Sequence, residues 1–122
     1  MPNAISAGKE PTQCSLWENP SLVLGGMAAR FELIETYVKE SHIWRYLLKC
    51  RECGQLYFFE FREEIDWEDG DDPQYMTYIP VETAEDIDRL KNSSSFGLLA
   101  FFPRIQDDRP KGVVRGTPRW LR

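Results

Sequence analysis

Two cysteines, Cys50 and Cys53, stand three positions apart and are followed at once by Gly54. Strand-like apolar residues lie on both sides of them, so the spacing predicts a tight turn between two strands, with both thiols at the turn. Such a turn places two sulfurs on one side of the backbone, close enough to share a tetrahedral metal ion. Glycine suits the position after the second cysteine because this turn commonly needs a positive φ there. The pattern therefore predicts a metal site.

The motif C-x-x-C-G between strands resembles one half of a zinc ribbon or of a rubredoxin-type knuckle, over residues 47–58. The resemblance implies that zinc is the cofactor and that Cys50 and Cys53 bind it. The chain has no second C-x-x-C pair, and ribbons serve many unrelated tasks. The resemblance therefore gives a cofactor and no activity.

A tetrahedral ion needs two further ligands, and Cys14 and His42 are the remaining thiol and the single imidazole of the chain. If residues 43–49 form a strand, His42 lies roughly 20–25 Å from Cys50, at about 3.3 Å per residue. A helix over 27–40, antiparallel to that strand, would instead bring the Cys14 region to the turn. We expect a metal site of Cys50, Cys53 and either Cys14 or His42, with Cys14 favoured. The alternatives are a cluster of reduced, metal-free thiols and, less favoured, a redox pair, which would place the first thiol at a helix N-terminus.

Length and composition predict one domain over residues 1–122, with a loose arm over 1–13 and an irregular basic tail over 104–122. No run approaches the roughly 18 apolar residues that a membrane span requires, so we expect no membrane partner. The first residues lack the basic start and apolar core of a signal peptide. Three cysteines cannot all pair within one chain, which favours a reducing compartment, and we expect a cytoplasmic protein.

Charge is unevenly distributed along the chain. Residues 60–88 carry twelve acidic and one basic side chain, whereas residues 89–122 carry eight basic and two acidic ones. One interpretation is that the basic tail folds back on the acidic segment and each screens the other. The other is that the acidic segment docks a basic protein, with nucleic acid disfavoured because the acidic charges oppose phosphate.

Trp67 lies among the acidic residues, and an aromatic framed by carboxylates is suited to anchor a basic partner. The candidate partner-binding residues are Trp67, Asp66, Glu68, Asp69, Asp71 and Asp72. The alternative is that the aromatics of this region, Trp67, Tyr75 and Tyr78, pack inward and the acids form a solvated rim. An EF-hand is excluded because Gly70 at its sixth position would place Ile65 at its first. With one histidine and no nucleophile motif, we assign no catalytic residue, and an enzyme is disfavoured.

The predicted fold is α+β: a three-stranded antiparallel meander built on the turn, covered by two or three helices. The strands are expected over 43–48, 55–62 and 74–81. Helices are expected over 83–92, capped by Thr83, and over 96–102. The segment 27–40 shows a helical stripe, although its β-branched residues leave a strand as the alternative.

These observations favour a small zinc-stabilised cytoplasmic module that docks a basic macromolecule. Neutralisation of a basic toxin, the task of small acidic bacterial immunity proteins, is one concrete form of this function. The alternatives are a nucleic-acid-binding protein of zinc-ribbon type and, less favoured, a redox or hydrolytic enzyme.

Overall fold

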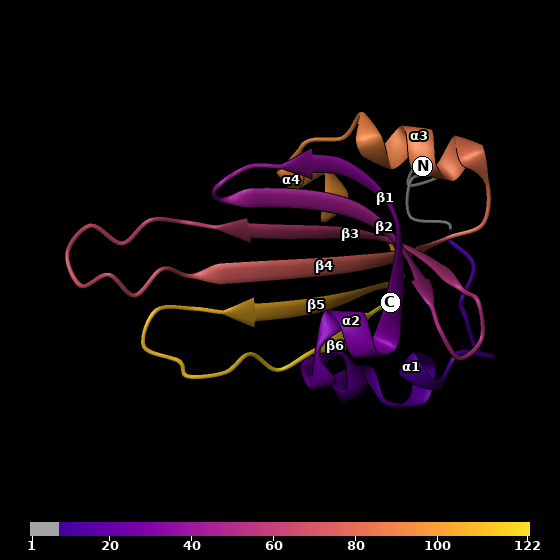
Figure 1. The fold of residues 1–122 in the computed structure, drawn as a ribbon, viewed down its shortest axis with the longest axis horizontal. Helices are drawn as coiled ribbons and strands as arrows, with labels where there is room; N and C mark the ends of the chain where they lie inside the picture. Colours follow the sequence, from indigo (N-terminus) through magenta and orange to yellow (C-terminus); the bar gives the residue numbers. More distant parts are fainter. Residues whose placement is uncertain (1–7) are drawn as a thin grey trace.

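Six antiparallel strands form one sheet in the computed structural model, which describes residues 8–122 (Figure 1). Every strand pairs with its neighbour in sequence, so the sheet is a simple meander. The strands are β1 (Phe31–Lys39), β2 (Ile43–Cys50), β3 (Leu56–Glu63), β4 (Gln74–Val81), β5 (Arg104–Arg109) and β6 (Arg119–Leu121). The chain is thus α+β, as predicted, but the sheet has twice the expected number of strands.

Short helices cover the two faces of the sheet. One face is covered by α1 (Ser15–Glu18), the 3₁₀ helix η2 (Pro20–Gly25) and α2 (Met27–Arg30), and we call it the N-terminal face because these elements precede the sheet in the chain. The other face is covered by α3 (Ala84–Lys91) and α4 (Ser95–Leu98), and we call it the helical face (Figure 1). Each face has its own buried apolar cluster. No helix within residues 8–122 is long and apolar enough to cross a bilayer.

Strand β3 is apolar on both sides because both faces of the sheet are covered. Tyr57, Phe59 and Phe61 belong to the cluster on the N-terminal face, and Phe58 belongs to the cluster on the helical face. Side chains alternate between the faces along a strand, so one uninterrupted aromatic run supplies both cores.

The helix expected over 27–40 forms only over Met27–Arg30, and the strand alternative holds for Phe31–Lys39. Pairing with β2 satisfies the backbone groups along one side of this segment, since β1 is an outer strand of the sheet. Two irregularities, between Leu33 and Glu35 and between Thr36 and Val38, shift the register of β1. Each extra residue disturbs the alternation of faces, and this concealed the strand pattern in the sequence.

The tail expected to be irregular over 104–122 instead contributes β5 and β6 to the sheet. Trp120 packs against the cluster on the N-terminal face, and its Nε1–H donates to the carbonyl of Leu16 at 2.7 Å. The expected arm over 1–13 also meets the body: Gly8 N–H donates to Phe102 O, and Pro11 is buried. Residues 1–7 of that arm lie outside the described part of the chain.

Helix α3 begins as predicted, at the N-cap Thr83. The Thr83 side chain accepts from the Asp86 N–H, and the Asp86 carboxylate accepts from the Thr83 N–H, which is a capping box. Helix α4 is shorter than the helix expected over 96–102, and Phe96 in it is 85% exposed.

A buried ion pair on the helical face was not predicted. Arg45 Nη2 and Nε lie 2.8 and 2.9 Å from Glu60 Oε2, which also accepts from Ser95 Oγ at 3.0 Å. Arg45 further donates to the carbonyls of Leu90 and Lys91 at the end of α3. The pair therefore ties the centre of the sheet to both helices that cover it.

Candidate metal centre and hairpin tip

The turn between β2 and β3 has the geometry of a metal-binding knuckle. Cys50 N–H donates to Gln55 O, and Gly54 N–H donates to Cys50 O, both at 2.8 Å. Gly54 has φ +83°, as its position predicted, and a side chain there would be strained. The turn thereby holds Cys50 and Cys53 on the same side of the backbone.

Cys14 joins this pair from the start of α1. The sulfurs of Cys14, Cys50 and Cys53 all lie within 4.8 Å of one another. Cys14 and Cys50 are buried, while Cys53 is partly exposed. In a tetrahedral site with Zn–S bonds of about 2.3 Å the sulfurs stand about 3.8 Å apart, so a small contraction would suit the three thiolates to zinc.

The surroundings of Cys50 and Cys14 shift the pKa values of their thiols in opposite directions. Burial of Cys50 favours the neutral thiol, but hydrogen bonds from the backbone N–H groups of Cys53 and Glu52 outweigh burial and lower the pKa. Burial raises the pKa of Cys14 to about 12, although its sulfur accepts a hydrogen bond from the Tyr57 hydroxyl at 3.2 Å. A bound cation would replace the proton on Cys14 and compensate the charge that burial disfavours.

His42 is not brought to the cysteines. It lies in the turn between β1 and β2, at the opposite end of β2 from Cys50, and its Nδ1 lies 2.8 Å from Glu63 Oε1. Within residues 8–122 no histidine, carboxylate or fourth cysteine joins the three thiols. One position of a tetrahedral ion is therefore left for water or another exogenous ligand.

The predicted partner-binding residues lie in the connection between β3 and β4, residues 64–73, which we call the hairpin tip. It projects beyond the covering helices together with the connection between β5 and β6 (Figure 1). Asp66 Oδ1 accepts from the N–H groups of Glu68 and Asp69, and its Oδ2 accepts from that of Asp71. Asp66 thus orders the loop from inside.

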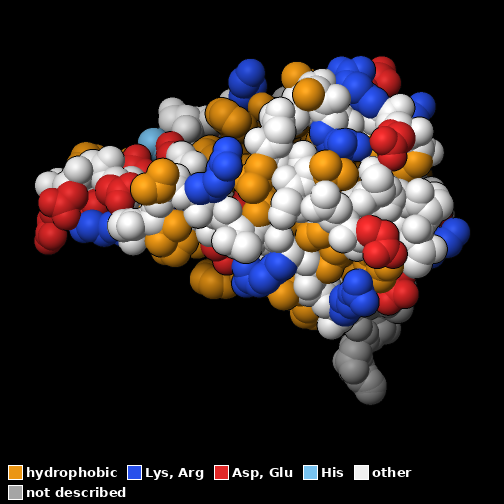
Figure 2. Space-filling model, turned by 90° about the horizontal axis from the view of Figure 1, so that it is seen from below, with side chains coloured by type: hydrophobic (Ala, Val, Ile, Leu, Met, Phe, Trp, Pro, Cys, Tyr) orange, Lys and Arg blue, Asp and Glu red, His pale blue; other side chains and the backbone are white. Residues whose placement is uncertain are grey.

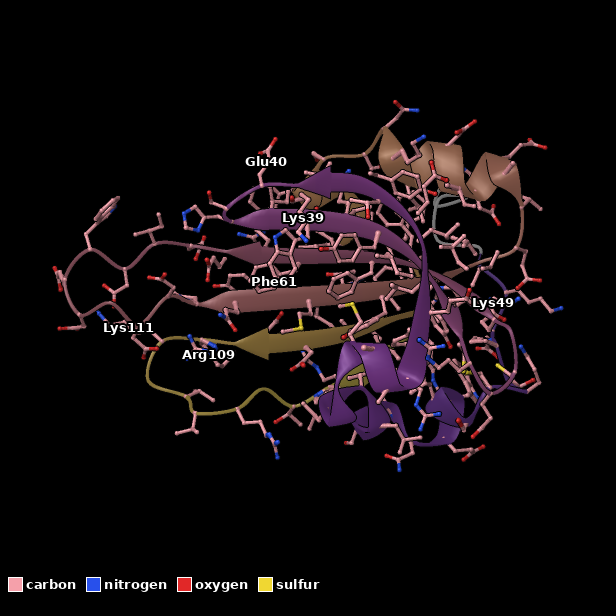
Figure 3. All side chains as sticks on the ribbon, in the orientation of Figure 1. Lys39, Glu40, Lys49, Phe61, Arg109 and Lys111 are labelled. Carbon is pink, nitrogen blue, oxygen red and sulfur yellow. The ribbon has the colours of Figure 1, made fainter. Side chains whose placement is uncertain are left out.

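Two residues of the basic tail hold the hairpin tip. Lys111 Nζ lies 3.0 Å from Asp66 Oδ2 and 2.8 Å from Asp69 Oδ2. Arg109 Nη1 lies 3.0 Å from Asp71 Oδ1, and Arg109 also donates to the carbonyl of Asp72 (Figure 3). The basic tail therefore folds back on the acidic segment, which is one of the two interpretations of the charge pattern.

Two of the clamped carboxylates, those of Asp66 and Asp71, have a lowered pKa. Lys111 is the main cause at Asp66, with help from the backbone N–H groups of the loop. At Asp71 the main causes are the Gly112 N–H, which donates to Oδ2 at 2.7 Å, and Arg109. These acids are ionised and paired within the chain, Asp66 with Lys111 and Asp71 with Arg109.

What the hairpin tip displays is chiefly Trp67, which is 88% exposed. Glu68 and Asp69 beside it are also exposed, and acidic side chains gather at this narrow end of the molecule (Figure 2). Ile65 is 39% exposed, and Val114, from the neighbouring connection, is 97% exposed. The alternative that the aromatics pack inward is thus wrong for Trp67, but it holds for Tyr78, which is buried in the core.

Sequence reasoning did not single out Val114, or Arg109 and Lys111 as clamps. The sequence does show basic and apolar residues in a segment rich in proline and glycine. Where these residues lie relative to the hairpin tip, however, depends on the pairing of β5 with β4, which the sequence pattern did not predict. Comparison with protein-family models, with curated proteins and with solved structures finds no match for this chain.

Proposed function

We propose that this chain is a small zinc-stabilised cytoplasmic module that docks a basic protein through its hairpin tip. The observation that carries the proposal is the 88% exposure of Trp67 on a loop that is ordered by hydrogen bonds and ion pairs. Exposure of an indole to water is unfavourable, and within the described residues this ring does not serve the core.

The order of the loop supports a binding role. A partner that covers Trp67 would not have to immobilise the loop first, because Asp66 and Lys111 already hold it, and pre-organisation reduces the entropic cost of association. Tryptophan is among the residues most enriched at the energetic centres of interfaces. The exposed acids Glu64 and Glu68 would favour a basic partner and raise its association rate.

The cysteine cluster supports zinc as a stabilising ion. One sulfur comes from the start of α1 and two come from the turn between β2 and β3, so an ion bound to all three would link these two segments. Three free thiols suit a reducing compartment, which is the basis for proposing the cytoplasm. The knuckle and its resemblance to half a zinc ribbon are evidence for a bound zinc ion, but they do not favour any particular function.

The nucleic-acid alternative loses its main support in this arrangement. Arg109 and Lys111 of the basic tail are already paired with Asp71, Asp66 and Asp69. Phosphate would have to compete with these carboxylates at close range. The basic tail therefore acts as a clamp on the hairpin tip in our proposal.

Co-purification from the native host tests the proposal. Wild type and Trp67→Ala serve as baits, with Phe96→Ala as the matched control, because Phe96 is an equally exposed aromatic on α4. We expect a basic protein that wild type and Phe96→Ala retain and that Trp67→Ala loses. A set of retained proteins that is the same for all three baits would contradict docking through the hairpin tip.

Binding kinetics with the purified partner extend the test. Trp67→Ala should chiefly speed dissociation, because it removes the desolvated anchor. Glu68→Gln should slow association, and added salt should slow it further as screening increases. Glu68 is the suitable charge variant because its side chain makes no ion pair within residues 8–122. Association rates that do not respond to salt would contradict a basic partner.

A further inference from the structure

The helical face of the sheet is apolar at one end and polar at the other. Its apolar cluster includes Phe58 and Ile79, which lie toward the turn between β2 and β3. Toward the hairpin tip, the strand register aligns a polar row across five neighbouring strands: Arg45, Glu60, Thr77, Gln106 and Arg119. Residues that pair directly in register project on the same face of a sheet. The first four members of the row are 3–7% exposed, and because burial of polar side chains is unfavourable, the row is a candidate for a functional role.

A groove of ≈ 200 Å³ lies over this polar row. Its lining includes Glu60, Gln106 and Arg119 of the row, together with Arg104 and Asp108 of β5. The volume is below the range of pockets that hold drug-sized molecules, so the groove suits a smaller ligand. The groove is therefore a small polar site on an otherwise covered face.

Gln106 fixes the side chains on the floor of the groove. Its Oε1 accepts from Thr77 Oγ1 at 3.0 Å and from Arg104 Nε at 3.1 Å. Its Nε2 donates to Asp108 Oδ1 at 2.8 Å. Alternate residues of a strand share a face, so the Gln106 amide lies between the guanidinium of Arg104 and the carboxylate of Asp108. The two opposite charges are thus close neighbours that do not meet directly.

The charges that line the groove lack counter-charges within the chain. Among residues 8–122 neither Arg104 nor Arg119 forms an ion pair with a carboxylate, and Asp108 forms none with a cation. Arg104 is 7% exposed, and burial lowers the pKa of its guanidinium; Asp108 opposes this shift and Arg119 adds to it. All three charges therefore act on one another across the groove.

Two atoms of these side chains are free to bind a ligand. Arg104 Nη1 donates to the carbonyls of Leu99 and Phe101, whereas within residues 8–122 Arg104 Nη2 and Asp108 Oδ2 form no hydrogen bond. Both atoms are open to solvent, because Asp107 Oδ1, on the other face, is the one enclosed polar side-chain atom of these residues that lacks a partner. The groove thus offers one unused donor and one unused acceptor.

The two signs of charge select the class of ligand. Arg104 and Arg119 would attract a simple anion, but Asp108 would repel it, and for a simple cation the effects are reversed. A zwitterion satisfies both signs, because its carboxylate accepts from guanidinium N–H groups while its ammonium donates to a carboxylate. The apolar part of the lining, Leu99 and Leu121, offers a surface to an aliphatic side chain.

We infer that the groove binds a free aliphatic α-amino acid, with its carboxylate at Arg104 and Arg119, its ammonium at Asp108 and its side chain against Leu121. In an α-amino acid the two charged groups are joined through one carbon, so a single small molecule can bridge the charges that Gln106 keeps apart. The inference is independent of docking through the hairpin tip and of a metal at the cysteines.

L-leucine is the probe, and two compounds that each lack one of its charges are the matched ligands. Isocaproate is leucine without the amino group, and isoamylamine is leucine without the carboxylate. The readout is NMR of the backbone amides of β5 and β6, the strands that carry Arg104, Asp108 and Arg119. We expect L-leucine to shift these signals with a Kd on the order of 1 mM. Each matched ligand should bind about tenfold more weakly or worse, because it leaves one charge of the groove unanswered.

Two variants separate the ends of the ligand. Asp108→Asn should reduce leucine affinity about tenfold and leave isocaproate affinity at the wild-type value or higher. Arg119→Gln should reduce the affinity for both leucine and isocaproate. Asp88→Asn and Arg89→Gln on α3 are the matched controls, because neither residue lines this groove, and both should retain wild-type affinity.

Circular dichroism of each variant confirms that it is folded, and the matched ligands test the inference on the wild-type protein alone. Binding of isocaproate or isoamylamine as tight as that of leucine would overturn the inference. Full leucine affinity in folded Asp108→Asn, or no shift of the β5 and β6 amides at high leucine concentration, would overturn it as well.

Discussion

Zinc should raise the thermal stability of this protein, and the rise should depend on Cys14. An ion that binds only the folded state adds about 4 kcal/mol to the free energy of unfolding at a free concentration 1,000 times its Kd. For a chain of 122 residues the unfolding entropy is about 0.26 kcal/mol per degree. The expected rise in Tm is therefore about 16 °C.

Cys14→Ser isolates the contribution of the ligand that lies outside the turn. It leaves Cys50 and Cys53 in place, and its hydroxyl can keep the hydrogen bond with Tyr57. Two thiolates without the third hold zinc far more weakly. We expect the zinc-dependent rise in Tm to fall to about 4 °C or less, which corresponds to about 1 kcal/mol for a chain of this length.

The assay is thermal unfolding by circular dichroism under reducing conditions, in zinc buffered by a chelator, with metal content measured by mass spectrometry. His42→Ala is the control and should keep the full rise, because His42 lies at the far end of β2 from the cysteines. A Tm that does not respond to zinc while all three thiols are free would refute the reasoning. Loss of the zinc effect in His42→Ala would refute the ligand set.

Three further predictions concern the fold. Phe59→Ala should lower the free energy of unfolding in urea by roughly 3–5 kcal/mol, because Phe59 is 1% exposed; a loss below about 1 kcal/mol would contradict its place in the core. Glu60→Ala should cost a similar roughly 3–5 kcal/mol, because it leaves Arg45 buried without its carboxylate, and adding Arg45→Leu should recover part of the loss. Lys111→Ala should speed amide hydrogen exchange in residues 64–73 without changing exchange in β3; unchanged exchange at the hairpin tip would show that the clamp does not order it.

Local signals made part of the fold predictable. The Cys50, Cys53 and Gly54 pattern located a turn whose conformation depends on residues within it, and Thr83 with Asp86 located a helix start for the same reason. The alternation of aromatic residues in β3 located a strand that is buried on both faces. For the turn and the helix start, the interactions that decide the structure lie within a few residues of one another.

The rest depends on contacts between residues that are distant in sequence. The polar residues of β5, among them Arg104, Gln106 and Asp107, are typical of a solvated segment. Pairing with β4 nevertheless places β5 in the sheet and buries these side chains. Arg45 and Glu60 look like ordinary surface charges until β2 and β3 pair and the helices cover them. We predicted that Cys14 would lie near the turn because a helix over 27–40 would bring it there. Cys14 does lie near the turn, but most of that segment forms the strand β1 instead of a helix.

The two outer strands of the sheet have a consequence for self-association. A long, regular outer strand is a template on which a second copy can add a strand, and this is a common route to aggregation. Here β1 is interrupted by two register shifts, and β6 has three residues. Leu33 and Ile34 are exposed on β1, yet the interruptions prevent a continuous row of donors and acceptors along it. The sheet is thus protected at both margins against growth by strand addition, and we expect the protein to remain dispersed at high concentration despite its many aromatic residues.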